Sequence, residues 1–240
     1  MTIRFDNRVA IVTGAGNGLG RAHALLLASR GAKVVVNDPG GAVDGKGGGH
    51  AAADKVVDEI KAAGGEAISD GCSVTDEGGV ARMVQKVMDT WGRIDILINN
   101  AGIECFSEFD ALTETEIEQT IATNLTGAIL LTRLVVPLMK SQRFGRIINM
   151  ASTAGKHGPA YGAVYGATKA GLIAFTQSLR GELSEFGILS TAICPGFATD
   201  GGIYDEIVKA TGRRTPPLLG GTSAGAVARA VVRAIRTAPP

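Results

Sequence analysis

Three polar residues in the second half of the sequence have the types and spacing for proton transfer: Ser152, Tyr165 and Lys169. Tyr165 and Lys169 are four positions apart in a helix-like stretch, so both side chains share one helix face. A phenol has a reference pKa of about 10, and a nearby ammonium lowers that pKa by favouring the phenolate. We therefore expect Tyr165 to act as a general acid–base, while Ser152 holds the substrate oxygen and stabilises its developing charge.

A glycine-rich stretch near the N-terminus predicts a second kind of site. Residues 13–20 read TGAGNGLG and join a strand-like run to a helix-like segment. Gly14, Gly18 and Gly20 allow a tight turn and close approach of a ligand, although Leu19 makes the spacing GxxxGxG instead of GxGxxG. A helix start supplies free N–H groups and partial positive charge. The stretch, including Asn17 and Leu19, therefore predicts a pyrophosphate site for a dinucleotide.

Asp38 ends the next strand-like run and indicates which dinucleotide is bound. An acidic residue about 20 positions past the glycine turn is placed to accept hydrogen bonds from the adenosine ribose hydroxyls. Its charge would repel a 2′-phosphate, and neither Asn17 nor Pro39 supplies a cation for that phosphate. We therefore expect NAD in preference to NADP.

These residues need a scaffold, and the apolar pattern supplies one. Short runs rich in Val and Ile alternate with longer amphipathic stretches, which predicts a parallel sheet buried on both faces. The fold class is therefore α/β: one Rossmann domain over residues 1–240, a doubly wound sheet with helices on both faces. Strands are expected at 9–13, 33–37, 94–99, 146–150 and 189–194, with a weaker one at 66–72; helices are expected at 18–30, 51–63, 76–91, 114–140, 161–186 and 222–236.

Two stretches interrupt this alternation. Residues 39–49 read PGGAVDGKGGG and are expected to form a mobile loop. Residues 197–219 mix Gly, Thr and Pro around a short helical piece at 204–210. Because they follow a strand at the ligand-binding edge of the sheet, they are expected to act as a lid. An ordinary surface loop stays the alternative for both.

Taken together, these motifs resemble the short-chain dehydrogenase/reductase family, in its conventional length class. The resemblance runs from Arg8 to about Gly196. Besides the glycine motif and the Ser–Tyr–Lys set, it includes NNAG at residues 99–102, Asn124 within NLTG, and the pair Pro195–Gly196. It implies hydride transfer between a nicotinamide cofactor and a secondary alcohol or ketone.

The resemblance also implies roles for individual residues. Tyr165 would be the general acid–base, Lys169 would lower its pKa and bind the nicotinamide ribose, and Ser152 would orient the substrate. Asn124 would hold a water in a proton relay through Lys169. The remaining implied cofactor contacts are Asn100, Ala101 and Gly102 on the adenosine side, Ser73 and Val74 after the third strand, and Pro195, Gly196 and Thr199 near the carboxamide.

The sequence departs from the family pattern at three places. Ser73–Val74 stands where the family often has Asp-Val, so the adenine contact of that Asp is missing. Thr199 comes three positions past Gly196, where the family usually has its Thr four past. Members usually add a last strand after the helix that ends here near Arg236, and the sequence stops at Pro240, which leaves a truncated chain as an open alternative.

Several functions remain open at this stage. Asp38 and the glycine-rich run after it resemble the dehydrogenase part of multifunctional enzymes that oxidise (3R)-hydroxyacyl-CoA, but the resemblance weakens after Ile103. The C-terminal part resembles bacterial members of unassigned substrate. An NADPH-dependent 3-oxoacyl reductase would need a cation near Asn17 or Asp38. A non-catalytic dinucleotide-binding protein would lack Tyr165 or Lys169, and both are present.

Composition narrows the partners and the location. The chain has 240 residues, is 45% hydrophobic and has a formal net charge of +1, so no charge excess points to nucleic acid or an anionic membrane. Its three cysteines form no CxxC pair and its three histidines do not cluster, which predicts reduced thiols and no metal site. We expect a cytoplasmic enzyme of small molecules. Small residues along the helix at 161–186, by likeness to the family, predict a homo-oligomer, a dimer or tetramer.

Overall fold

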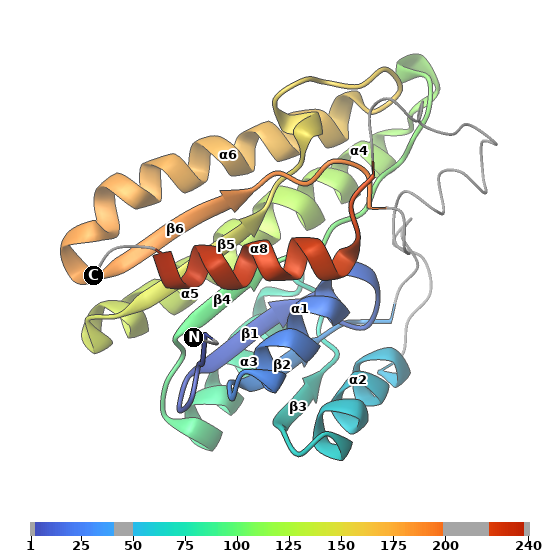
Figure 1. The fold of residues 1–240 in the computed structure, drawn as a ribbon. Helices are drawn as coiled ribbons and strands as arrows, with labels where there is room; N and C mark the ends of the chain where they lie inside the picture. Colours follow the sequence, from blue (N-terminus) through green and yellow to red (C-terminus); the bar gives the residue numbers. More distant parts are fainter. Residues whose placement is uncertain (1–2, 41–49, 199–220, 238–240) are drawn as a thin grey trace.

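The computed structural model describes residues 3–40, 50–198 and 221–237, in which six strands form one parallel sheet (Figure 1). The order across the sheet is β3-β2-β1-β4-β5-β6. The sheet thus winds outward from β1 in both directions, as predicted for a doubly wound fold. The strands are β1 (Val9–Thr13), β2 (Lys33–Asn37), β3 (Glu66–Asp70), β4 (Ile96–Asn99), β5 (Gly145–Met150) and β6 (Ile188–Ile193).

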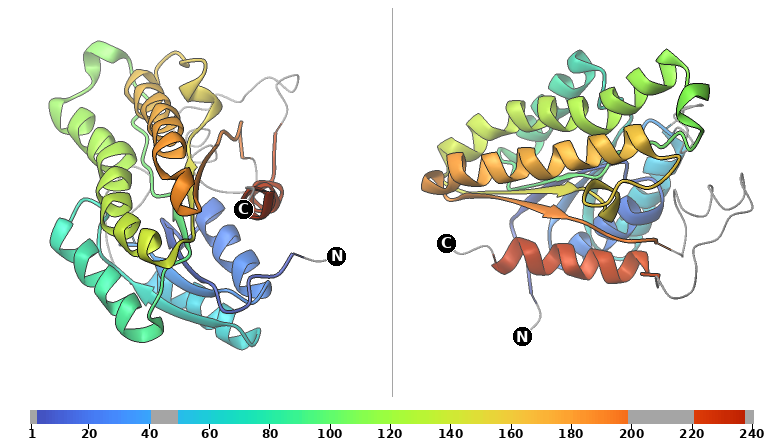
Figure 2. Two further views of the ribbon diagram at one scale, coloured as in Figure 1. Left: turned by 90° about the vertical axis from the view of Figure 1, so that its left-hand side faces the viewer. Right: turned by 90° about the horizontal axis from the view of Figure 1, so that it is seen from above.

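Helices cover both faces of this sheet. Figure 2 shows α8 and α1 on one side and α5 and α6 on the other. In chain order the helices are α1 (Gly18–Ser29), α2 (Ala51–Ala62), α3 (Glu77–Trp91), α4 (Glu114–Ile121), α5 (Gly127–Gln142), α6 (Ala163–Leu183) and α8 (Ala224–Thr237).

Alternate residues of each strand feed two separate cores. Ala10 and Val12 pack in a cluster with Leu27 of α1 and residues of α2 and α8. Val9 and Ile11 pack in a second cluster with Leu131 of α5 and residues of α3. All five residues of β1 are buried. Burial on both faces explains why the strands read as continuous apolar runs.

The long helix predicted over residues 114–140 is interrupted in the structure. It divides into α4, a π-helical turn (Ala122–Thr126) and α5, which has Pro137 inside it. By length and composition alone, Glu114–Gln142 could cross a membrane. Leu131, Val135 and Met139 on its inner side are fully buried against the sheet. Of the most apolar window of this stretch 33% is buried, so one side packs on the sheet and the other side is apolar and not covered by the described residues.

Other boundaries move by a few residues, for local reasons. The helix predicted from Tyr161 begins at Ala163, because Tyr161 has a φ of 66° in the left-handed region. The strand predicted from Ile94 begins at Ile96. Thr199, most of the predicted lid and most of the glycine-rich loop lie outside the described residues.

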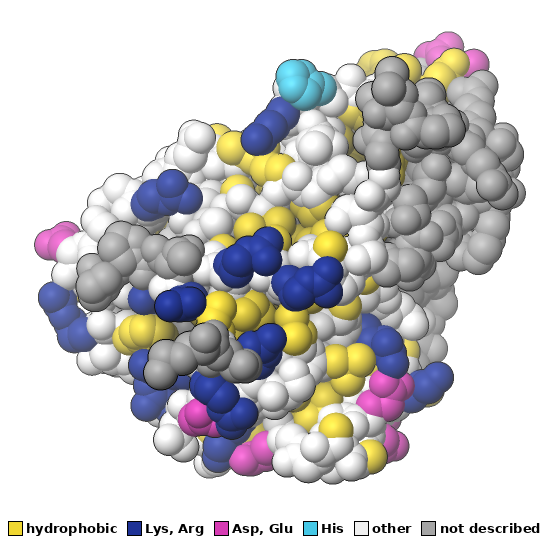
Figure 3. Space-filling model, in the orientation of Figure 1, with side chains coloured by type: hydrophobic (Ala, Val, Ile, Leu, Met, Phe, Trp, Pro, Cys, Tyr) yellow, Lys and Arg dark blue, Asp and Glu magenta, His cyan; other side chains and the backbone are white. Residues whose placement is uncertain are grey.

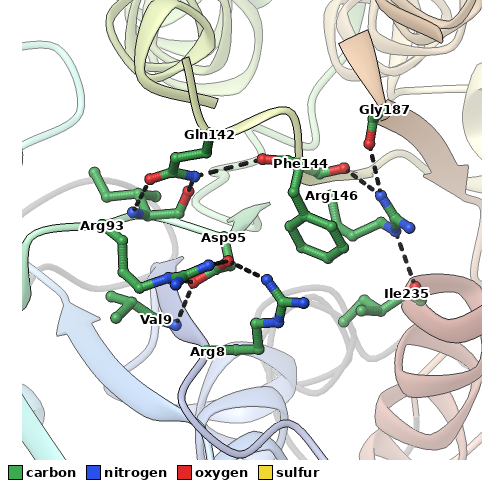
Figure 4. Close-up of polar contacts among 11 residues, drawn as sticks. Arg8, Val9, Arg93, Asp95, Gln142, Phe144, Arg146, Gly187 and Ile235 are labelled. Atoms are coloured by element: carbon green, nitrogen blue, oxygen red, sulfur yellow. Dashed lines mark hydrogen bonds and ion pairs between the residues drawn. The ribbon is translucent and has the colours of Figure 1, made fainter. Parts of the chain in front are cut away.

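Four charged side chains and one aromatic ring at the amino-terminal ends of the strands form a cluster, which we call the basal cluster: Arg8, Arg93, Asp95, Phe144 and Arg146 (Figure 4). Asp95 is fully buried and accepts hydrogen bonds from Arg8 (2.7 Å), from Arg93 (2.6 and 2.7 Å) and from the Val9 N–H (3.0 Å). The guanidinium groups of Arg8 and Arg146 lie 3.9 and 4.4 Å from the centre of the Phe144 ring.

Arg146 extends this cluster to the end of α8. Its guanidinium donates to the carbonyls of Gly145 (2.8 Å), Gly187 (3.0 Å) and Ile235 (3.2 Å). A cation near the last carbonyls of a helix is favourable because of the helix dipole. The basal cluster therefore ties β4, β5 and the C-terminal helix together, away from the edge where ligands bind.

The face of the molecule that carries α8 is rich in basic side chains (Figure 3). Figure 3 shows Lys and Arg side chains spread over the face that carries α8, with hydrophobic side chains between them and Asp and Glu towards its margins. Helix α8 contributes Arg229, Arg233 and Arg236, and its sequence contains no acidic residue.

Candidate active site

The glycine turn between β1 and α1 forms a backbone cradle at the carboxyl end of the sheet. Gly14 has a φ of 61°, and a Cβ added there would lie 2.9 Å from Ala101 Cα, too close to fit. Asn17 is the N-cap of α1, yet its side chain makes no capping hydrogen bond, and the first turn contains no acidic residue. Free N–H groups at a helix start and a turn in which alternate residues are glycine suit the pyrophosphate of a dinucleotide.

Asn100 and Ala101 lock this turn to the end of β4. The Asn100 side chain donates to the carbonyls of Thr13 (2.9 Å) and Gly14 (3.0 Å). The backbone N–H groups of Asn100 and Ala101 both donate to the Thr13 hydroxyl, each at 3.0 Å. The NNAG motif thus holds the switch point between β1 and β4 in shape, a support role that spacing alone did not reveal.

Asp38 lies beside the glycine turn, as predicted from its position after β2. Its carboxylate accepts from the Gly16 N–H and from the Gly40 N–H, each at 2.7 Å. Because a carboxylate can accept about four hydrogen bonds, capacity remains for two ribose hydroxyls. No Lys or Arg among the described residues forms an ion pair with it.

Ser152, Tyr165 and Lys169 are brought together by β5 and α6. Ser152 follows β5 and caps a short 3-10 turn (Thr153–Gly155), with its hydroxyl accepting from the Ala154 N–H at 3.1 Å. A Cβ at Gly155 would lie 2.6 Å from the Lys169 carbonyl carbon, so glycine is what lets this turn approach α6. The Ser152 side chain also acts on the Tyr165 phenol, in the direction that lowers its pKa.

Lys169 is buried, and its ammonium is held in place. The Nζ donates to the Met150 carbonyl at 2.8 Å and lies 5.4 Å from the centre of the Tyr165 ring. Burial lowers the pKa of Lys169 to about 8, although the Glu104 carboxylate acts in the opposite direction. This lysine therefore sits close to its protonation equilibrium near physiological pH.

The pKa of Tyr165 differs from the sequence expectation. We expected Lys169 to lower it, but burial raises the pKa of the phenol and the Glu104 carboxylate raises it further, while the Ser152 hydrogen bond lowers it in part. The phenol is therefore a proton donor in this form of the site. The expectation erred because the desolvation of Tyr165 and the charge of Glu104 depend on the fold and not on the i, i+4 spacing.

Asn124 lies in the π-helical turn and is fully enclosed. Its side chain donates to the Ile103 carbonyl and accepts from the Ile103 N–H, both at 2.8 Å, and it also donates to the Thr168 hydroxyl at 3.3 Å. A π-turn leaves one helix position out of register, and such turns often occur at functional sites. Asn124 thereby connects α4 and α5 to the segment after NNAG and to α6.

The remaining predicted residues lie at the same edge of the sheet. Ser73 and Val74 follow β3, where the Ser73 hydroxyl pairs with the Thr75 hydroxyl at 2.8 Å. Pro195 and Gly196 follow β6, and the Pro195 carbonyl accepts from the Thr153 N–H at 3.0 Å.

Sequence reasoning missed Glu104. This half-buried carboxyl group comes shortly after NNAG and interacts electrostatically with both Tyr165 and Lys169. The sequence signal that could have identified Glu104 is its position, five residues after the end of β4, where ligands bind. The site therefore combines a phenol, a hydroxyl, an ammonium and a carboxyl beside a dinucleotide cradle, a set suited to proton transfer during hydride exchange.

Comparison with known proteins gives a consistent result. The family model described as short chain dehydrogenase matches residues 8–208. The chain is 43% identical over 194 residues to a 3-oxoacyl-[acyl-carrier-protein] reductase of Synechocystis, covering 80% of this chain and 75% of that protein. A crystal structure of a short chain dehydrogenase from Mycobacterium avium matches with a TM-score of 0.74 and 41% identity, covering 82% of this chain and 71% of that chain.

The chain is also 46% identical over 193 residues to the peroxisomal hydratase-dehydrogenase-epimerase of Saccharomyces cerevisiae. That alignment covers 80% of this chain but 21% of the yeast protein. The chain thus spans about a fifth of that relative, which is a larger protein with further activities in its name.

Proposed function

Because the chain belongs to the short-chain dehydrogenase family, we propose that it transfers a hydride between NAD and a secondary alcohol or ketone, with Tyr165 as the general acid–base. The observation that carries this proposal is the convergence of Ser152, Tyr165 and Lys169 beside the glycine turn. When bound, the nicotinamide ring gives or accepts the hydride. The protein then has to orient the substrate and move one proton.

In the proposed mechanism, Ser152 and Tyr165 bind the substrate oxygen by hydrogen bonds. In ketone reduction the Tyr165 hydroxyl donates its proton as the hydride arrives, and its raised pKa means that the phenol carries this proton at neutral pH. In alcohol oxidation Tyr165 has to accept the carbinol proton, so the rate should rise with pH. Lys169, fixed by Met150, contributes positive charge beside the phenol and a hydroxyl-binding ammonium for the nicotinamide ribose.

The preference for NAD follows from the charge at the end of β2. The Asp38 carboxylate lies on the glycine turn, where a 2′-phosphate would meet a like charge with no cation from the described residues paired to it. One relative is a 3-oxoacyl reductase, and an NADPH-dependent enzyme of that kind is the alternative that this charge disfavours. Oxidation of a (3R)-hydroxyacyl-CoA is a second alternative, supported by the likeness to the peroxisomal relatives.

The proposal is tested by following reduced nicotinamide by its absorbance with a panel of secondary alcohols. We expect turnover with NAD, and at least tenfold lower kcat/KM with NADP. Asp38→Ala should weaken the binding of NAD. It should also bring the kcat/KM values with NAD and NADP to within a few-fold of each other, because the repulsion of the 2′-phosphate is lost. Turnover only with NADP would favour the reductase, and cofactor binding without turnover would contradict catalysis.

We further propose that the chain forms a homodimer or homotetramer in the cytoplasm. The outer side of Glu114–Gln142 supports an oligomer, because only 33% of its most apolar window is buried within one chain. Ala163, Ala167 and Ala170 are exposed along α6 and would allow close helix approach. Light scattering after size-exclusion chromatography should give a multiple of 24.6 kDa; the monomer mass would refute the oligomer.

A further inference from the structure

Glu104 lies inside the proposed active site, and the hydride-transfer chemistry does not use it. It is two residues past Gly102, where an added Cβ would be 3.4 Å from Lys169 Nζ. Its carboxylate is close enough to raise the pKa values of both Tyr165 and Lys169. Its Oε1 atom lies 3.3 Å from a Cβ built on Gly162, the residue directly before α6, the helix that carries Tyr165 and Lys169.

The Glu104 carboxylate has no hydrogen-bond donor among the residues that the structure describes. Within the described ranges no hydrogen bond or ion pair ends on it, although the side chain is half-buried. Burial raises its pKa to about 7, and the Lys169 ammonium offsets this only in part. A buried acceptor without a donor costs free energy, so native proteins normally satisfy such groups with protein, water or ligand.

Apolar side chains border this carboxylate on one side. Measured from a Cβ built on Gly162, Glu104 Oε1 lies at 3.3 Å, Pro159 Cγ at 2.9 Å and Phe106 Cε2 at 3.8 Å. The Phe106 and Tyr161 rings lie 5.8 Å apart, and the Ser107 N–H donates to the Tyr161 carbonyl at 3.1 Å. The segments 104–107 and 159–162 thus form one wall with a carboxylate set in apolar surroundings, which is the usual composition of a specificity site.

We infer that Glu104 accepts a hydrogen bond from the substrate, and that the preferred substrates carry a hydroxyl on the carbon beside the reacting one, as vicinal diols do in oxidation and α-hydroxy ketones do in reduction. This inference rests on the proposed function. In oxidation of a diol, one C–H hydride goes to NAD, the proton of the same carbinol goes to Tyr165, and the second hydroxyl stays bound to Glu104 unchanged. The products are an α-hydroxy ketone, NADH and one proton.

A 3-hydroxyacyl thioester is a poorer match to this wall. Beside its carbinol it offers a methylene group and then a thioester carbonyl, which is an acceptor. An ionised Glu104 would face that acceptor without a hydrogen bond, and sites built to bond a hydroxyl discriminate strongly against analogues that lack it. Glu104 should therefore favour vicinal diols over 3-hydroxyacyl thioesters as substrates.

The test compares butane-2,3-diol with its monomethyl ether, 3-methoxybutan-2-ol, using each stereoisomer and NAD at pH 8. The ether keeps the acceptor oxygen but loses the second donor, and it is larger by one methylene group, a difference in size that is the same for every protein variant compared. For the unmodified protein we expect the diol to exceed the ether in kcat/KM by at least tenfold. Glu104→Gln keeps an acceptor without charge and should lower that ratio partway, while Glu104→Met should bring it to about one.

Glu108→Gln is the matched control, because it removes a charge from an exposed position of the same segment and should keep the ratio of the unmodified protein. The ratio should also rise from pH 6 to pH 8 as Glu104 ionises; Tyr165 and Lys169 act on both substrates alike and cancel. Equal kcat/KM for diol and ether in the unmodified protein would overturn the inference and leave hydride transfer intact. Absence of turnover with these substrates and with butan-2-ol would instead contradict the proposed function.

Discussion

Two carboxylates flank the same strand, and their surroundings are opposite. Asp95 comes directly before β4 and accepts hydrogen bonds from two arginines and a backbone N–H (Figure 4). Burial alone would raise the pKa of Asp95, but the hydrogen bonds from Arg93, Val9 and Arg8 lower it below its ordinary value. Glu104 comes shortly after β4, has no such donor among the described residues, and has a pKa raised to about 7.

The comparison of Asp95 with Glu104 distinguishes a buried charge that stabilises the fold from a buried charge in a candidate functional site. At the amino-terminal end of the sheet, the Asp95 carboxylate receives hydrogen bonds from Arg8, Arg93 and the Val9 N–H. Its charge therefore holds β1 and β4 together. At the carboxyl end Glu104, Tyr165 and Lys169 have shifted pKa values, and no described residue donates a hydrogen bond to Glu104. Perturbed titratable groups in a cleft are typical of a site that a ligand completes.

The largest effect should come from the phenol at the carboxyl end. Tyr165→Phe removes the proton that the substrate oxygen exchanges, so we expect kcat to fall by about 10²- to 10⁴-fold. The affinity for NAD, measured by fluorescence titration, and the midpoint of thermal unfolding should change little. A variant that keeps a tenth of the activity would show that another group carries the proton.

The next effect should appear at the opposite end and in stability instead of activity. Asp95→Asn removes the charge that pairs Arg8 and Arg93, so we expect a loss of about 3 kcal/mol in the free energy of unfolding. Denaturant titration at pH 7 measures this loss, and kcat of the folded variant should stay within twofold. If Asp95→Asn lowered kcat tenfold without loss of stability, the two ends would not be separate in function.

This contrast also explains what the sequence could predict. The sheet and its helices were predictable, because β1 and β2 are apolar on both faces and the glycine turn marks the first crossover. The grouping of Ser152, Tyr165 and Lys169 followed from motif order. The π-turn at Asn124 was not predictable, since the whole stretch has helical periodicity. Neither Glu104 nor the basal cluster was predicted, because each depends on which segments meet in space.

A smaller effect should follow from the pH dependence of stability. Between about pH 4.5 and pH 7 folded Glu104 keeps a proton that the unfolded chain has released, so its burial stabilises the fold below this window and the benefit is lost as the pH rises through it. Relative to Glu104→Gln, the unmodified protein should therefore be less stable at pH 8 than at pH 5, by about 1–2 kcal/mol after allowing for partial exposure.

Denaturant titrations of both proteins at pH 5 and pH 8 measure that difference. Buried His23, whose pKa is lowered to about 4, gives the opposite pH dependence, but it is present in both proteins and cancels in the comparison. A difference in stability that is the same at both pH values would show that Glu104 is not buried as a neutral acid. Because the pKa of Asp95 is lowered below its ordinary value, Asp95 is ionised at both pH values, so the stability loss caused by Asp95→Asn should be the same at pH 5 and at pH 8.

The smallest effect should be on the pH profile of alcohol oxidation. Ionised Glu104 raises the pKa of Tyr165, and oxidation needs the phenol to accept a proton, so Glu104→Gln should move the rising limb of kcat/KM to lower pH. We expect a shift below about one pH unit, since a nearby charge in a partly solvated site contributes on the order of 1 kcal/mol. Measured with butan-2-ol, which has no second donor, the shift reports only on Tyr165. An unmoved limb would mean that Glu104 acts on substrate choice without setting the proton affinity of the phenol.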